Sequence, residues 1–211
     1  MLGTINLHGS LLPQYRGAAP INWAVINGET STGVTTFKLK HEIDTGDILL
    51  QEKIDIGKTE TAGELHDRMK DIGAALLLRT IHFIAEEEVK IVPQSELTSP
   101  AIEIRHAPKL FTQTCEIDWN KPVDDVYNFI RGLSPHPAAY TQFENKQLKI
   151  FRSDKLHEAP GITSGKFETD KKTYIRFACT DGYIDVKELQ LQGKKKLWVE
   201  DFLRGYRFSE K

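Results

Sequence analysis

The chain has 211 residues, of which 39% are hydrophobic and 27% are charged, and its formal net charge is −2. This composition excludes a fibrous or intrinsically disordered protein, and the length suits one large domain or two small ones. No apolar run approaches the roughly 18 to 20 residues that cross a bilayer, and the N-terminus lacks the segments of a signal peptide, so we expect a cytoplasmic protein without membrane contact.

The first half of the chain predicts a mixture of strands and helices. Residues 4–8 alternate polar and apolar side chains, which in a strand would place Asn6 and His8 on one face. Thr61 and Glu64 have capping-box spacing at the start of a helix whose apolar stripe indicates core packing. The elements expected in this half are a strand over 4–8, a loop over 9–17, a helix over 18–27 ended by Gly28, strands over 33–40 and 47–56 joined by a loop that carries Asp44, and a helix over 61–86.

The second half begins with an interdomain linker, because periodicity is lost after residue 88 and prolines interrupt the chain up to about residue 114. A short helix follows, with Gly132 as its expected C-cap. Several short strands separated by turn signals then predict a small barrel. The elements expected here are a helix over 122–131, strands over 139–143, 147–153, 166–168, 173–178 and 183–191, and a helical turn over 198–203.

The two parts of the chain differ in charge. Residues 1–108 carry 10 basic and 15 acidic side chains, whereas residues 109–211 carry 18 basic and 15 acidic ones. A basic C-terminal part favours a polyanionic partner, although an imbalance of this size is also common on solvated surfaces. Cys115 and Cys179 form neither a CxxC pair nor a disulfide framework, and we expect both to be reduced core thiols.

A carboxamide, an imidazole and a carboxylate occur in two short motifs. Asn6 and His8 share the first predicted strand, and Asp44 follows 36 residues after His8 in a DTGD turn. Acyl transfer to an amine requires a proton acceptor, a donor to the oxyanion and a proton for the leaving group. Asn6 can donate an amide hydrogen bond, His8 can donate or accept a proton, and Asp44 can orient His8. The set contains no serine or cysteine nucleophile, so it suits transfer to a nucleophile that the substrate brings.

Each of these residues also has a simpler interpretation. Asn6 and His8 can be the solvated face of a strand, and Asp44 can be an ordinary turn residue. The other histidines have no ligand spacing, and no second carboxylate pairs with His8 at a helical interval, so we expect no metal site.

The flanks of these residues closely resemble the methionyl-tRNA formyltransferases of bacteria and organelles. The resemblance covers essentially the whole chain, and its opening motif followed by the Asp-x-Gly loop is specific for formyl transfer. Its motifs are NLHGSLLPQYRGAAPI at 6–21, DTGD at 44–47, IDW at 117–119, IRGLSPHPA at 130–138, GKKK at 193–196 and DFL at 201–203.

The resemblance implies transfer of a formyl group from 10-formyltetrahydrofolate to the amino group of initiator methionyl-tRNA. It implies that Asn6 and His8 polarise the formyl group and hold the tetrahedral intermediate, while Asp44 supports His8 and the proton transfers. It further implies that the tetrahydrofolate site is lined by Ser10, Leu11, Leu12 and Pro13, with the Asp44 loop beside the pterin. Taken alone, residues 11–13 are equally a rigid connection between a strand and a loop.

The resemblance also implies the domain organisation. Residues 1–88 would be a partial, Rossmann-like α/β formyltransferase domain, 89–114 a linker, and 115–211 a small all-β barrel of the oligonucleotide-binding (OB) type that helps to hold the tRNA. Basic residues alternate there with Phe143, Phe151, Tyr174 and Phe177, a mixture compatible with RNA contacts, although such alternation more often makes the aromatics core. The basic residues are Lys146, Lys149, Arg152, Lys171, Lys172, Arg176 and Lys194 to Lys196.

The sequence departs from the family at its start, because the family's catalytic domain begins well upstream of the strand that carries Asn6. We therefore expect an N-terminally truncated chain with impaired activity, whose catalytic strand lacks sheet neighbours. Ala18 and Asp47 favour the tRNA enzyme over a sugar-nucleotide formyltransferase, and a phosphoribosyl-glycinamide formyltransferase would not need the region after Thr114. A non-catalytic RNA-binding or folate-binding remnant is the alternative from another class.

Overall fold

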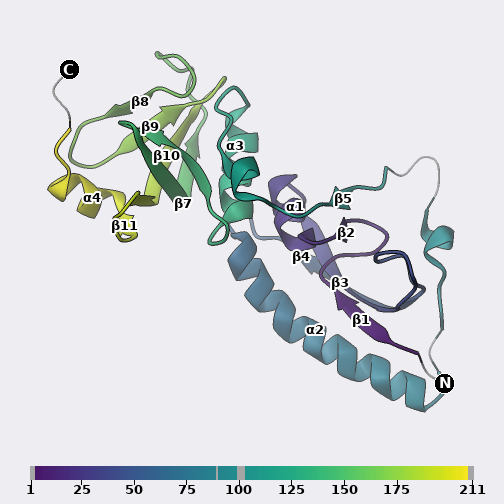
Figure 1. Ribbon diagram of the computed structural model, residues 1–211. Helices are drawn as coiled ribbons and strands as arrows, with labels where there is room; N and C mark the ends of the chain where they lie inside the picture. Colours follow the sequence, from purple (N-terminus) through teal and green to yellow (C-terminus); the bar gives the residue numbers. More distant parts are fainter. Residues whose placement is uncertain (1–2, 89, 99–102, 209–211) are drawn as a thin grey trace. The chain divides into compact units, whose positions relative to one another are not determined.

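The computed structural model describes residues 3–88, 90–98 and 103–208 of the chain (Figure 1). Contacts divide the chain into two compact units. The first contains Met1–Val25 and Glu29–Leu110, and the second contains Ile26–Gly28 and Phe111–Lys211. Each unit has a sheet of its own, and together they make a mixed α/β protein.

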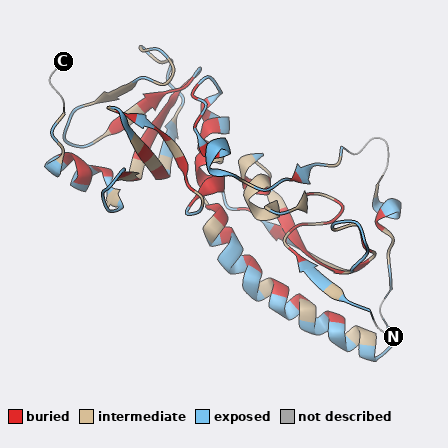
Figure 2. Cartoon of the chain, in the orientation of Figure 1, coloured by how far each residue is buried: buried red, intermediate tan, exposed pale blue. Residues whose placement is uncertain are grey.

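The sheet of the first unit has the strand order β1-β3-β4, formed by β1 (Ile5–His8), β3 (Ser31–Lys38) and β4 (Ile48–Asp55). Both pairings are antiparallel, and their register places His8 opposite Thr35. The central strand β3 is almost wholly buried, as its red colour in Figure 2 shows. All three strands and the short helix α1 (Pro20–Ile26) confirm elements predicted from the sequence.

The long helix α2 (Ala62–Ala85) packs against β3 and β4. Thr61 is its N-cap, and the capping box with Glu64 is formed, as predicted. The buried side chains of the helix include Leu65 and Leu76, both fully covered. At Gly73 the helix lies so close to the sheet that an added Cβ would be 2.8 Å from a methyl carbon of Leu7. The apolar stripe is therefore core packing, as the periodicity indicated.

Three short elements of the first unit were not predicted. The strand β2 (Arg16–Gly17) pairs in parallel with β5 (His106–Ala107), and a 3₁₀ helix covers Gln94–Leu97. Gly17 has a φ of +126°, and a Cβ there would collide with the carbonyl oxygen of Ala107. The close approach of the two backbones thus requires glycine at this position. Parts of the segment 89–114 consequently lie on the first unit as ordered structure.

The second unit is built on a curved, mainly antiparallel sheet that follows the 3₁₀ helix Thr112–Cys115 and the helix α3 (Val123–Leu133). Its aromatic core contains Phe143 and Phe177, both fully buried, and Trp119 stacks on Phe177 with the ring centroids 4.7 Å apart. The helix α4 (Val199–Gly205) completes the unit. The strands, in spatial order, are β6 (Ala139–Phe143), β7 (Lys146–Leu156), β10 (Tyr183–Leu191), β9 (Ile175–Ala178) and β8 (Phe167–Thr169), with β11 (Leu197–Trp198) paired to β10.

The predicted role of Gly132 is wrong. This glycine lies inside α3, and the C-cap is Ser134. A Cβ at Gly132 would be 2.8 Å from the backbone nitrogen of Ile26, so the glycine allows a close approach of two backbone segments and does not end the helix. Cys115 and Cys179 are both free and buried, as expected.

Candidate active site

The strand β1 carries the first two candidate residues on the side away from α2. Leu7 packs over Gly73 of that helix, so its neighbours Asn6 and His8 face the opposite side of the sheet. His8 is 7% exposed, whereas Asn6 is exposed. The oxygen Oδ1 of Asn6 accepts a hydrogen bond from the backbone nitrogen of Leu7 at 3.0 Å. The amide nitrogen of Asn6 is then the side chain's remaining polar group, and it can only donate.

The imidazole of His8 is held from both of its nitrogen atoms. Nε2 lies 2.9 Å from the carbonyl oxygen of Tyr15, and Nδ1 lies 3.6 Å from Oδ2 of Asp44. A carbonyl oxygen only accepts, so Nε2 carries the proton in this contact. Nδ1 is then the ring nitrogen that faces the carboxylate of Asp44.

Asp44 stands in the loop between β3 and β4, with its backbone in the left-handed region at a φ of +54°. Its carboxylate is 12% exposed, and Oδ2 accepts a hydrogen bond from the backbone nitrogen of Gly17 at 3.0 Å. The same oxygen thus faces both His8 and Gly17. Two residues later the loop passes Lys38 so closely that a Cβ at Gly46 would collide with its carbonyl oxygen.

The loop after β1 is fixed by one buried hydroxyl. Thr35, which is 0% exposed, donates to the carbonyl oxygen of Ser10 at 2.6 Å and accepts from the backbone nitrogen of Leu12 at 3.1 Å. Gln51 adds two hydrogen bonds of 2.9 Å, one to Thr35 Oγ1 and one to the carbonyl oxygen of Leu12. These contacts give the segment from Ser10 to Pro13 one defined path, with Leu11 half-buried and the other three residues buried.

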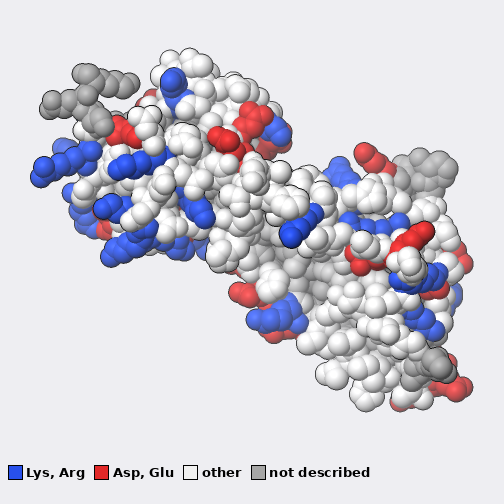
Figure 3. All heavy atoms as spheres, in the orientation of Figure 1, with Lys and Arg blue, Asp and Glu red and all other residues white. Residues whose placement is uncertain are grey.

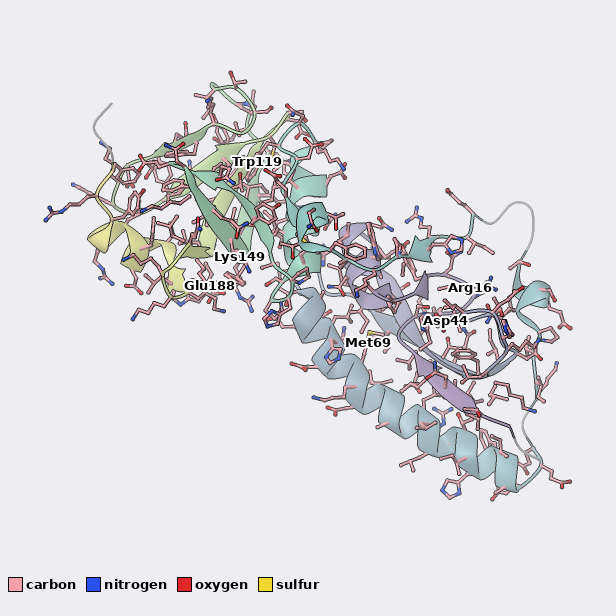
Figure 4. The ribbon with its side chains drawn as sticks, viewed as in Figure 1. Arg16, Asp44, Met69, Trp119, Lys149 and Glu188 are labelled. Atoms are coloured by element: carbon pink, nitrogen blue, oxygen red, sulfur yellow. The ribbon has the colours of Figure 1, made fainter. Side chains whose placement is uncertain are left out.

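Two residues that the sequence did not single out complete the arrangement. Gln94 is 3% exposed, and its amide nitrogen donates to the carbonyl oxygens of Asp44 and Gly46, each at 2.8 Å. Its amide oxygen accepts from Nε and Nη2 of Arg16 at 3.0 and 2.6 Å. Figure 4 labels Arg16 and Asp44, which lie near each other in this part of the first unit. A polar residue in a proline-flanked segment gives no local signal of such a role.

Tyr15 links the site to the segment that follows α2. Its backbone nitrogen donates to the carbonyl oxygen of Arg105 at 2.7 Å, and its hydroxyl donates to Glu29 at 2.6 Å. The guanidinium of Arg105 also donates to Glu29, at 2.8 Å. Because the carbonyl of Tyr15 is the partner of His8, these contacts position the imidazole indirectly.

The basic residues of the second unit are mostly exposed, while Phe143, Phe151 and Phe177 are buried. Figure 3 shows that many lysine and arginine side chains of this unit gather on one side of the face that it draws. Arg176 lies 4.4 Å from the ring centroid of Tyr174, and Lys196 lies 5.0 Å from that of Phe151. The aromatics are thus mainly core, and the positive charge is left at the surface.

Within residues 3–88, 90–98 and 103–208, no three histidine, cysteine, aspartate or glutamate side chains are arranged to hold a metal ion. In the same ranges no helix is both long enough and apolar enough to span a membrane.

Comparisons with known proteins agree with the motifs of the sequence. The family model described as formyl transferase matches residues 1–81, and the model of the formyl transferase C-terminal domain matches residues 109–207. A methionyl-tRNA formyltransferase from Phocaeicola vulgatus is 52% identical over 99% of this chain, and one from Porphyromonas gingivalis is 47% identical over 99%. The chain spans 66% of the length of both relatives.

Two solved structures have a similar fold. HypX from Aquifex aeolicus in complex with tetrahydrofolic acid has a TM-score of 0.69 at 19% identity, covering 96% of this chain and 36% of that one. An N-formyltransferase from Helicobacter canadensis, in complex with folinic acid and dTDP-3-aminofucose, has a TM-score of 0.68 at 22% identity and covers 92% of this chain and 66% of that one. At these identities the likeness concerns the fold.

Proposed function

The chain belongs to the formyltransferase family, and on that ground we propose that it is an enzyme that transfers a formyl group from 10-formyltetrahydrofolate to the amino group of initiator methionyl-tRNA, in translation initiation. The main support is the pair of His8 and Asp44, which come from positions 36 residues apart and meet at 3.6 Å with low exposure. The acceptor is proposed from the relatives named methionyl-tRNA formyltransferase, which share about half of the residues.

The proposed reaction needs no protein nucleophile. The amino group of the acceptor attacks the formyl carbon and forms a carbon–nitrogen bond, and the bond from the formyl carbon to the folate nitrogen breaks. The amino group loses one proton, and the folate nitrogen gains one. Asn6 would donate its amide hydrogen bond to the developing oxyanion, because its Oδ1 is already engaged by Leu7. Removing such a donor typically costs a factor of about 10² to 10³ in kcat.

His8 and Asp44 would carry out the proton transfers of this reaction. Nδ1 of His8 can exchange a proton while Nε2 stays bound to the carbonyl of Tyr15, and the Asp44 carboxylate stabilises the protonated ring. Gly17 keeps that carboxylate in place through its backbone nitrogen.

The folate is proposed to lie on Ser10, Leu11, Leu12 and Pro13, with the Asp44 loop beside the pterin. Within this segment the half-buried Leu11 is the accessible side chain, and the buried Ser10, Leu12 and Pro13 would fix its position through Thr35 and Gln51, which supports a preformed pocket with an apolar wall. Residues 1–88 are proposed to be part of a Rossmann-like catalytic domain, and the first unit to which most of them belong continues to Leu110.

The second unit is proposed to hold the tRNA. Its curved sheet would be an OB-like barrel over residues 115–211, joined to the catalytic domain by residues 89–114. The exposed basic residues of this unit can contact RNA phosphates. Lys149, which is half-buried, lies on β7, the strand between β6 and β10.

A sugar-nucleotide formyltransferase is the second candidate. The solved structure from Helicobacter canadensis carries dTDP-3-aminofucose, and its fold covers 92% of this chain. The two acceptors differ strongly in size and charge, so one experiment distinguishes the two candidate functions. The purified chain is given 10-formyltetrahydrofolate with either methionyl-tRNA or an amino-sugar nucleotide, and single-turnover formylation is measured.

The test of the proposed site uses a matched pair of histidines. His8 and His66 both lie beside an aspartate, but the His66 side chain is 61% exposed and its partner Asp67 is 75% exposed. We expect His8→Asn to lower kcat by about 10²- to 10⁴-fold and His66→Asn to leave it unchanged. If the chain formylates the amino-sugar nucleotide and not methionyl-tRNA, the sugar-nucleotide formyltransferase replaces the tRNA enzyme as the proposed function. No turnover with either acceptor, together with retained RNA or folate binding, would show a non-catalytic binding protein.

A further inference from the structure

The side chain of Gln94 uses its whole hydrogen-bonding capacity inside the first unit. It is 3% exposed, its oxygen accepts two bonds from Arg16, and its nitrogen donates to the carbonyl oxygens of Asp44 and Gly46. All four distances lie between 2.6 and 3.0 Å. A buried amide with four partners is strongly fixed in orientation, because any rotation leaves donors and acceptors unpaired.

Gln94 itself is fixed to the sheet. Two residues earlier, Val92 exchanges two backbone hydrogen bonds with Ile48, of 2.8 and 2.9 Å, at the start of β4. A short 3₁₀ helix then begins at Gln94. The amide therefore reaches the Asp44 loop from an ordered segment and not from a free linker.

The contacts of Gln94 form a closed circuit around the carboxylate of Asp44. Gln94 holds the backbone of Asp44 on one side and the side chain of Arg16 on the other, and the next residue, Gly17, donates to Asp44 Oδ2. The backbone of Asp44 has a φ of +54°, a region that aspartate adopts more readily than most residues, and the two hydrogen bonds from Gln94 to the carbonyl oxygens of Asp44 and Gly46 hold the loop in it. The carboxylate position that faces His8 thus depends on this circuit.

We propose that Gln94 is a positioning residue that sets the distance between Asp44 and His8 for formyl transfer. The proposal rests on the function proposed above, and it concerns a residue that does not touch the reacting atoms. Glutamine suits this position because the contacts require two acceptor sites and two donors on one planar group. An ionised glutamate keeps the acceptor atoms but has no donor. Methionine has a similar length but has neither the amide acceptor nor the amide donors.

The experiment compares Gln94→Glu, Gln94→Met and the control Glu96→Gln, which changes an exposed residue of the same 3₁₀ helix. Formylation kinetics give kcat and KM, and hydrogen exchange followed by NMR gives the opening of the Gly17 amide. We expect both Gln94 variants to lose about 10- to 100-fold in kcat, with KM changed by less than about twofold. The Gly17 amide is expected to exchange at least about tenfold faster, and the control to match the wild type.

The two readouts keep the outcomes distinct. Unchanged kcat in folded Gln94 variants overturns the proposal, and so does a Gly17 amide that exchanges at the wild-type rate. A rise in KM with unchanged kcat would assign Gln94 to substrate binding and also overturns it. If the wild-type chain formylates no acceptor, the proposed function fails, while the Gly17 exchange still decides whether Gln94 holds the Asp44 loop.

Discussion

The hydroxyl of Thr35 provides a direct test of how the loop after β1 is held. It makes three hydrogen bonds, to the carbonyl of Ser10 and from the nitrogens of Leu12 and Gln51, at 2.6 to 3.1 Å. Thr35→Val keeps the shape of the side chain and removes all three. Gln51 can still bond to the carbonyl of Leu12, but the Ser10 carbonyl and the Leu12 amide lose their partner.

The expected cost follows from burial. Ser10 and Leu12 are 0% and 1% exposed, so their backbone groups have little access to water. An unsatisfied buried group costs about 1 to 3 kcal/mol, so two such groups give roughly 2 to 6 kcal/mol. Thr35→Ser keeps the hydroxyl and loses one buried methyl group, which costs about 0.8 to 1.5 kcal/mol.

The assay is urea unfolding followed by circular dichroism, combined with amide hydrogen exchange in each unit. Exchange in β3 should report the loss, and exchange in β10 of the second unit should not change. We also expect the valine variant to raise KM for the formyl donor, because the segment from Ser10 to Pro13 is the proposed folate contact. A valine variant as stable as the wild type, or more stable than the serine variant, would refute the assignment of this hydroxyl as the support of the loop.

Three further predictions concern other parts of the chain. Gly46→Ala should lower the free energy of unfolding by about 1 to 3 kcal/mol and reduce formylation, since its Cβ collides with the carbonyl of Lys38; unaltered kinetics would count against the assigned loop geometry. Burial, and to a smaller extent a neighbouring acidic side chain, raises the pKa of Cys179 to about 12. The neutral thiol therefore stabilises the folded state fully below pH about 9, and this stabilisation is lost as the pH rises towards 12. Unfolding measured at pH 8 and pH 10 should show that decline, and native Cys179 should resist alkylation at pH 8; fast alkylation would contradict its burial. Thr61→Ala should destabilise the chain by about 1 kcal/mol through loss of the α2 cap, against no change for the exposed Thr59→Ala in thermal unfolding.

Short-range signals in the sequence determined most of the secondary structure. The capping box of Thr61 and Glu64 indicated Thr61 at the start of α2, where it is the N-cap, and the turn signals around β6 and β10 gave the bounds that the structure has. Such signals depend on neighbours within one or two turns, so no tertiary contact is needed to interpret them. They were less informative at Gly132, where a glycine within a helix serves a backbone contact and not a cap.

The residue types of the candidate site were also evident from the sequence, because the motif around Asn6 and His8 and the turn with Asp44 are specific. What tertiary structure alone decided is how they are held. The pairing of β2 with β5 joins residues 90 positions apart, and the contact of Gln94 with Asp44 spans 50 positions. A hydrogen bond across such a distance depends on the register and path of both segments, which no local pattern of side chains specifies. The sequence by itself therefore determined the chemistry that the chain carries, and the fold determined which buried amides and carbonyls keep that chemistry in place.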